Sequence, residues 1–208
     1  MDIEAKTIDI IFKAINDQIK LHKGQPYSIV VCGCTALIAK GLTNRKTKDV
    51  DVLGEVVENN GEINIKKINQ FPSWLIRTIY EVSMNFKMPG NWFNAGPTMQ
   101  LDYGLPCGFE SRLEKMEYGD FFNVYYISRF DQIFFKLNHS ICVGGTGYQV
   151  EDLLNLNPTQ EELFQAYKWM LTQYNSESIR ESLLHFLKKW DIMPDQILQE
   201  SLQRSDTH

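Results

Sequence analysis

The chain has 208 residues, of which 43% are hydrophobic and 23% are charged, and this composition is typical of a folded globular protein rather than a disordered one. No apolar run approaches the roughly 20 residues of a membrane-spanning helix, and the mixed-charge N-terminus does not resemble a secretory signal. We therefore expect a cytoplasmic protein that does not contact membranes. The net charge of −5 argues against a large nucleic-acid-binding surface, which needs clustered lysine and arginine.

The cysteines of the chain predict neither a disulfide framework nor a zinc site. There are four of them, which is too sparse for a disulfide scaffold at this length. Cys32 and Cys34 form a C-x-C pair, and no second pair lies at the spacing of a zinc site. We expect reduced thiols.

Helical and extended patterns alternate along the first half of the chain. Apolar residues at three- and four-residue steps predict helices, and short β-branched runs bounded by turn residues predict strands. The expected elements are a helix over about 5–22, a buried strand at 28–32, a short helix at 35–40, a strand around 50–53, a turn at 59–61 and a covering helix over 72–86. Gly33 separates the first strand from the next helix, so that strand, tight turn and helix are consecutive.

The second half of the chain is irregular at first and then helical. Residues 88–108 are rich in glycine, proline and asparagine, with one expected strand at 98–103. The later expected elements are a hairpin of 112–117 and 121–127, a helix from 128 to 141, a glycine-rich link at 144–147, and helices that begin at Thr159, Ser178 and Pro194. The expected organisation is an α/β core at 1–143, which includes the N-terminal helix, and a helical unit at 144–208 packed on that core.

Asp49 and Asp51 are the most informative pair of residues. Residues i and i+2 of a strand point to the same face, so both carboxylates converge while Val50 points into the core. Two carboxylates that close repel each other unless a cation lies between them. The pair therefore points to Mg²⁺ or Mn²⁺, with substrate phosphates in the remaining positions. The alternative is a pair of acidic residues on a surface strand, which is common.

Gly33 supports the functional interpretation of this pair. It lies where a buried strand ends and a helix begins, so a phosphate can approach its backbone and the first N–H groups of the helix. One short helix and a return loop separate Gly33 from Asp49, which would bring the acidic strand alongside the first strand. The alternative is an ordinary turn glycine.

The residues around these two features resemble a known family. The resemblance is to the G-G-T-A-L … R-x-T-x-D-[IV]-D motif of minimal bacterial nucleotidyltransferases, particularly the AbiEii-type toxins and their uncharacterised relatives. It is carried by Val31-Cys32-Gly33-Cys34-Thr35-Ala36-Leu37 and by Arg45-Lys46-Thr47-Lys48-Asp49-Val50-Asp51-Val52. A looser resemblance extends over 128–154, where Lys136-Leu137 fits a K-L-x-A motif and Asp152 fits an R-x-K-D-x-x-D motif.

This resemblance implies an α+β fold of the polymerase-beta-like nucleotidyltransferase type, with a mixed sheet, covering helices and a C-terminal helical unit. It also implies metal-dependent transfer of a nucleoside monophosphate from a nucleoside triphosphate to a hydroxyl group. Asp49 and Asp51 would hold Mg²⁺ or Mn²⁺ and act in catalysis. The nucleotide-binding residues that it implies are Gly33, Cys34, Thr35, Arg45, Lys48, Lys136 and Asp152.

Three of the candidate residues have open alternatives. Asp102 is the candidate for a third carboxylate that helps to deprotonate the acceptor, and the alternative is an edge-strand or turn aspartate. Lys136 would neutralise triphosphate charge from the edge of the apolar stripe of its helix, or would only be solvated. Asp152 would support Lys136, or would only begin a helix, where an acidic residue is favoured. The Asn91-Trp92-Phe93-Asn94 stretch is a further candidate for lining the nucleotide cleft.

Several positions depart from the family motifs, and two functions therefore stay open. The departures are Cys34, His139, Gln149, Glu151 and Asn155. The first function is an active transferase, toxin-like in one version, whose acceptor is an RNA, a protein or a small molecule. The second is a catalytically degenerate module that binds nucleotide or pairs with a protein such as an antitoxin. A resemblance of fold does not decide between them.

Overall fold

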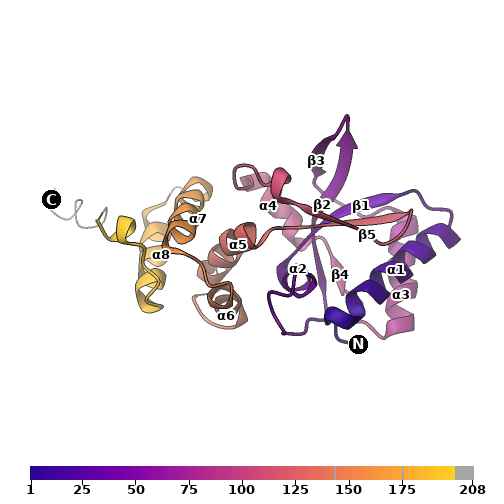
Figure 1. The fold of residues 1–208 in the computed structure, drawn as a ribbon, viewed down its shortest axis with the longest axis horizontal. Coiled ribbons are helices and arrows are strands. Elements are labelled where there is room, and N and C mark those ends of the chain that lie inside the picture. The colour runs from indigo at the N-terminus through magenta and orange to yellow at the C-terminus, as the bar shows by residue number, and fades with distance from the viewer. Residues whose placement is uncertain (143, 175, 200–208) are drawn as a thin grey trace. The chain divides into compact units, whose positions relative to one another are not determined.

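The chain folds into two compact units (Figure 1). The structure is a computed structural model, which describes residues 1–142, 144–174 and 176–199. The first unit spans residues 1–128 and holds a β-sheet with helices, and the second unit, from residue 129 onward, is helical in its described part. The expectation of a mixed sheet with covering helices is confirmed.

The first unit is built on a mixed sheet. Its strands are β1 (Tyr27–Cys32), β2 (Val50–Asn59), β3 (Glu62–Lys66), β4 (Phe93–Asn94), β5 (Glu114–Glu117) and β6 (Phe122–Tyr126). They lie in the order β3-β2-β1-β6-β5, and β4 pairs with β2. The central strand β1 is antiparallel to β2 and parallel to β6, and every residue of β1 except Ser28 is buried. A strand covered on both faces needs a nearly continuous apolar run, which residues 29–32 provide.

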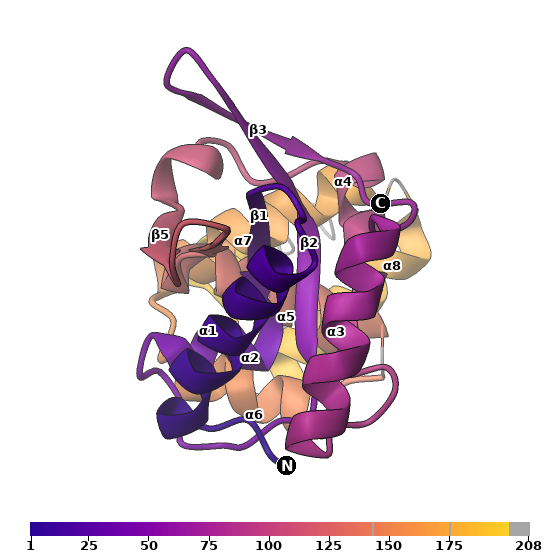
Figure 2. The same ribbon diagram turned by 90° about the vertical axis from the view of Figure 1, so that its right-hand side faces the viewer.

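Two long helices of this unit, α1 (Ala5–Leu21) and α3 (Ser73–Phe86), lie side by side (Figure 2). Both were expected from their apolar periodicity, and both are confirmed. The inward residues of α1 are at most 3% exposed, and they are Ile8, Ile11, Phe12, Ile15 and Ile19. Full burial of such a side chain stabilises a fold by about 1.5–3 kcal/mol, so this stripe anchors α1 on the core.

One local expectation in the first unit is wrong. The segment 98–103 is not a strand, because Gly96–Met99 forms the 3-10 helix η1 and Gln100–Tyr103 forms the short helix α4. Alternation of polar and apolar residues over so few positions fits either structure, and Pro97 favours the start of a helical turn. The expected strand around 50–53 is confirmed as part of β2, which extends to Asn59 and forms a hairpin with β3.

The second unit packs its helices around α5 (Arg129–Cys142). The other helices are α6 (Tyr148–Asn155), α7 (Gln160–Gln173) and α8 (Glu177–Lys189), and residues 195–199 are also helical. Because α5 packs against α6 and α7, the first unit ends at residue 128, before the expected boundary at 143. In the part of the chain that the structure describes, no helix has both the length and the apolar character to cross a bilayer.

Side-chain caps begin α7 and α8. The expected capping box of α7 is confirmed: the Thr159 hydroxyl accepts from the Glu162 N–H, and the Glu162 carboxylate accepts from the Thr159 N–H. The α8 helix is capped by Ser176, whose hydroxyl accepts from the Ile179 N–H at 3.3 Å. The expected start of this helix at Ser178 is therefore wrong, since Ser178 lies inside its first turn.

Arg129 closes the turn between α6 and α7. Its guanidinium donates to the carbonyl oxygens of Leu156 and Asn157 and to the Glu162 carboxylate, over 2.5–3.2 Å. The last carbonyls of a helix have no partner within it, and the five donors of a guanidinium can satisfy several acceptors together. Partial burial raises the pKa of Glu162, but hydrogen bonds from Arg129 and Thr159 outweigh this and hold that pKa below its usual value.

Candidate active site

The predicted site lies where β1 turns into α2 (Gly33–Ala39). Cys32, the last residue of β1, lies directly opposite Asp51 on the antiparallel neighbour β2. The return loop therefore brings the acidic strand alongside the first strand, as expected. The register shifts between Val30 and Val31, so Leu53 is an additional residue of β2. Such a β-bulge increases the local twist and re-aims the end of the strand, which here carries Asp51.

Asp49 directly precedes β2 and is held at two points. Its backbone carbonyl accepts from Thr35 Oγ1 at 2.7 Å, and Oδ1 of its carboxylate accepts from the Thr47 hydroxyl. Thr47 is fixed in turn by the N-terminal segment, because Thr47 and Ile3 exchange both backbone hydrogen bonds, at 2.7 and 3.1 Å. The half-buried carboxylate of Asp49 is therefore oriented by the surrounding chain.

Asp51 lies against the same turn. Its Oδ1 accepts from Asn94 Nδ2 at 3.2 Å, and its carboxylate packs against Gly33. Asp49 is hydrogen-bonded to Thr35 and Asp51 packs against Gly33, so both aspartates lie at the β1–α2 turn. Asn94 was not among the predicted site residues, apart from its place in a stretch considered for the cleft.

Two features of position 33 require a glycine: its backbone conformation and the close approach of a neighbouring side chain. Its φ is +66°, in the left-handed region that favours glycine. A Cβ at this position would overlap Asp51 Oδ2 and would lie 3.3 Å from Asp51 Cβ. The group that packs against Gly33 in the structure is therefore the Asp51 carboxylate.

Gly33→Ala is expected to lower the free energy of unfolding more than Gly41→Ala does, with a difference of about 1–3 kcal/mol from the added steric overlap. The two glycines form a matched pair, because Gly41 also has a φ of +66°, but a Cβ added there would meet no atom of the described residues within 4 Å. The difference between the variants isolates the overlap with Asp51. Urea unfolding of both variants measures it, and equal losses would show that Asp51 does not press on Gly33.

The other predicted residues of this region differ in exposure. Cys34 and Thr35 are 5% and 1% exposed, respectively. Arg45 is half-buried and Lys48 is exposed. The Thr35 hydroxyl already donates to the Asp49 carbonyl, so the structure shows it acting on Asp49. Their contacts with a nucleotide stay predictions.

Asp102, the candidate third carboxylate, lies exposed on α4 and forms an ion pair with Lys67. Within residues 1–142, 144–174 and 176–199, no three His, Cys, Asp or Glu side chains gather closely enough to hold a metal ion. Asp102 is therefore not gathered with Asp49 and Asp51 into a three-carboxylate group. Its role as a base stays a prediction.

Lys136 and Asp152 form a buried ion pair in the second unit. They are 4% and 2% exposed, and Lys136 Nζ lies 2.7 Å from Asp152 Oδ2 and 2.7 Å from Gln149 Oε1. The alternative that Lys136 is solvated on its helix is therefore wrong, whereas the expected support from Asp152 is confirmed. Gln149, one of the departures from the family motifs, is a direct partner of the lysine. The part of Lys136 and Asp152 in nucleotide binding stays a prediction.

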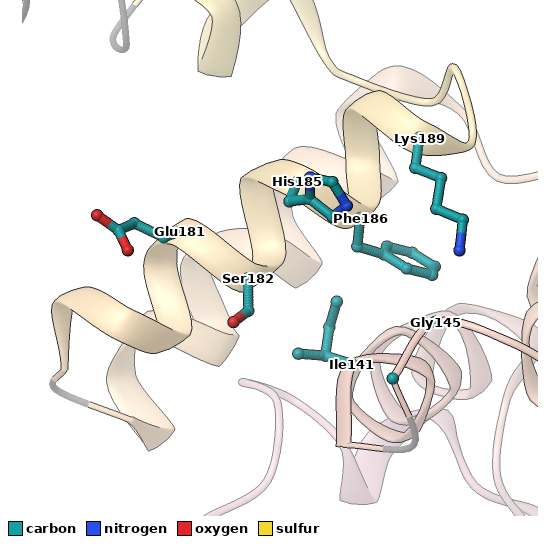
Figure 3. Close-up of a pocket in the computed structure, with 8 residues that line it drawn as sticks. Ile141, Gly145, Glu181, Ser182, His185, Phe186 and Lys189 are labelled. Atoms are coloured by element: carbon teal, nitrogen blue, oxygen red, sulfur yellow. The ribbon is translucent and has the colours of Figure 1, made fainter.

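A pocket in the second unit lies between α8 and the C-terminal end of α5 (Figure 3). Its volume is about 390 Å³. Ile141 and Phe186 point into the gap between the two elements, with Lys189 at its edge, while Glu181 points away. None of the predicted site residues lines this pocket.

The first unit thus combines a mixed sheet, a glycine turn at the end of β1 and two aspartates on the neighbouring segment, features consistent with a nucleotidyltransferase fold. Residues 9–142 match the family model described as "Nucleotidyltransferase of unknown function (DUF6036)", and the chain belongs to this family. The match includes Gly33, Asp49 and Asp51. It supports the nucleotidyltransferase part of the expected resemblance and does not single out the AbiEii-type toxins. No curated protein and no solved structure matches the chain significantly.

Proposed function

We propose that this chain is a metal-dependent nucleotidyltransferase that transfers a nucleoside monophosphate from a nucleoside triphosphate to a hydroxyl of an RNA, a protein or a small molecule. The observation that carries the proposal is the position of both aspartates at the β1–α2 turn, where Asp49 is hydrogen-bonded to Thr35 and Asp51 packs against Gly33. Membership of a nucleotidyltransferase family supports the reaction type. The motif resemblance supports a toxin-like version of this activity.

The donor atoms of the site fit Mg²⁺ or Mn²⁺. Hard divalent cations prefer carboxylate oxygens, and Mg²⁺ is usually held by one or two carboxylates together with substrate phosphates. Among the described residues no group of three His, Cys, Asp or Glu side chains could hold a metal, so on this proposal the substrate phosphates complete the site. A bound metal would stabilise the negative charge that develops on the phosphate oxygens.

The reaction requires one bond to form and one to break at the α-phosphorus. The acceptor oxygen bonds to this phosphorus, the bond to the β-phosphate oxygen breaks, and pyrophosphate leaves. Asp49 and Asp51 would hold the metal ion whose charge attracts the reacting phosphates, and Arg45 and Lys48 would supply further positive charge. The proton of the acceptor hydroxyl passes to a carboxylate, for which Asp102 is the candidate.

A second candidate function is a nucleotide-binding module without transfer activity, which senses nucleotide or pairs with a protein such as an antitoxin. The observation that favours it is the position of Asp102, which is ion-paired with Lys67 and not grouped with the two site aspartates. On this view the two aspartates would still hold a metal and its nucleotide, but no carboxylate of the described residues is placed to act as the base.

The wild-type protein is expected to transfer label from an α-³²P-labelled nucleoside triphosphate, with Mg²⁺ or Mn²⁺, to one of three acceptors: total RNA, cellular protein or a metabolite extract. Triphosphate and metal together should also raise the melting temperature, because a ligand at about 100 times its Kd adds about 2.7 kcal/mol to a folded state that alone binds it. ATP, GTP, CTP and UTP are each tested separately in both assays.

The position of the label provides the control. A γ-³²P label should leave with pyrophosphate, and its transfer would indicate a kinase and contradict the proposal. A melting shift without transfer to any acceptor would favour the binding module. The absence of both shift and transfer would contradict both candidate functions.

A further inference from the structure

A two-residue strand holds Asn94 beside Asp51. β4 pairs in parallel with β2, and Asn94 lies directly opposite Asp51 in this register. So short a strand needs anchoring from outside the sheet. Trp92, which is fully buried, provides this anchor. Its backbone carbonyl accepts a hydrogen bond from the Val50 N–H, and its indole N–H donates to the Ile79 carbonyl at 3.3 Å.

The side chain of Asn94 is oriented by two hydrogen bonds of opposite kind. Its Oδ1 accepts from the Gly96 N–H at 3.0 Å, and its Nδ2 donates to Asp51 Oδ1 at 3.2 Å. Because the backbone N–H of Gly96 needs an acceptor, the amide oxygen must face it, and the NH₂ group then faces the carboxylate. An aspartate at position 94 would satisfy Gly96 but would repel Asp51, and a leucine would satisfy neither. Only an amide of this length meets both demands.

We propose that Asn94 is a positioning residue that fixes the Asp51 carboxylate for metal binding, an inference that rests on the metal-dependent function proposed above. A carboxylate that accepts a hydrogen bond from Asn94 loses rotational freedom before the metal arrives. Partners that orient a metal ligand in this way commonly change metal affinity by about 10–100-fold when they are removed. Asn94 acts through Asp51 and is not itself assigned as a ligand.

Asn94→Ser tests this inference, because a serine hydroxyl can still accept from the Gly96 N–H but is too short to reach Asp51. The probe is Mn²⁺ alone, whose free concentration is measured by electron paramagnetic resonance at a temperature well below the melting point. We expect the Kd for Mn²⁺ to rise by about tenfold, with little change in the melting temperature of the metal-free protein. Asn94→Ala should raise the Kd for Mn²⁺ by a similar factor.

Asn123→Ser is the matched control. Asn123 is also a half-buried asparagine of the same sheet, and its Nδ2 donates to Ser28 Oγ at 3.2 Å. Its replacement should leave the Kd for Mn²⁺ unchanged. A purely structural role of Asn94 would lower the melting temperature without changing Mn²⁺ affinity in the folded protein, and that result would overturn the inference. Failure of both Asn94 variants to fold would overturn it as well.

The outcome separates this inference from the proposed function. If the wild type binds Mn²⁺ and Asn94→Ser binds it more weakly, the inference holds even where no acceptor receives label. If the wild type binds Mn²⁺ and Asn94→Ser binds it equally well, only the inference fails. If the wild type binds no Mn²⁺, the inference fails together with the metal-dependent part of the proposed function.

Discussion

Asp51→Asn is expected to lower transfer activity by about a thousandfold or more, while the protein stays folded. Metal-held phosphates contribute several kcal/mol to stabilising the transition state, and a thousandfold loss corresponds to about 4 kcal/mol. The variant keeps the side-chain shape beside Gly33 and keeps an oxygen that can accept from Asn94. Asp49→Asn should lower transfer activity to a similar extent, since Asp49 is the other aspartate at the β1–α2 turn.

The loss of activity in these two variants should not be accompanied by a loss of stability. Two neighbouring carboxylates without a cation repel each other, so removing one charge should leave the metal-free melting temperature unchanged or raise it. Asp120→Asn is the control, because Asp120 is an exposed aspartate in the turn between β5 and β6. Initial rates of label transfer at saturating metal measure the effect. Retention of full activity in Asp51→Asn would remove this residue from the catalytic machinery.

Lys136→Met is expected to lower the free energy of unfolding by about 3–5 kcal/mol. Methionine is unbranched like lysine and one atom shorter, and it carries no charge. The buried Asp152 carboxylate therefore loses its cation, and Gln149 Oε1 loses its donor. A domain is stable by only about 5–15 kcal/mol, so this loss is large. Lys188→Met, at an exposed position on α8, should change stability by less than about 0.5 kcal/mol.

A double-mutant cycle separates the ion pair from the packing of the lysine chain. Asp152→Leu alone should also destabilise the protein, because it leaves the ammonium group buried without its carboxylate. The variant with both substitutions should recover much of the loss, since no uncompensated charge is left. Urea unfolding of the four proteins gives the coupling energy. Additive losses would contradict the assignment of Lys136 and Asp152 as a coupled pair.

The same variants test the nucleotide role that the sequence predicts for Lys136. In urea-free buffer and at low temperature, Lys136→Met should bind a nucleoside triphosphate more weakly than the wild type, and Lys136→Arg should be a partial replacement. Unchanged affinity in folded Lys136→Met would leave the lysine with a structural role only. This readout is independent of the loss of stability.

Short-range patterns were sufficient for much of the fold and for the central part of the candidate site. The apolar stripe of α1, the Gly33 turn and the capping box at Thr159 each depend on residues a few positions apart, which the sequence displays directly. The motif around Asp49 and Asp51 is also local in sequence, although only Asp51 lies within β2 and Asp49 directly precedes it. The family match over residues 9–142 agrees with the interpretation of that motif as nucleotidyltransferase-like.

Contacts between distant residues could be established only from the tertiary structure. The segment 98–103 is helical although its alternation fits a strand, because so few residues do not specify a period. Asn94 meets Asp51 across 43 positions, through a strand of two residues whose pairing depends on the burial of Trp92. Lys136 is buried because Asp152 lies on the packed helix α6. Whether a lysine is solvated or buried depends on a partner charge, and the pattern of its own helix does not contain that information.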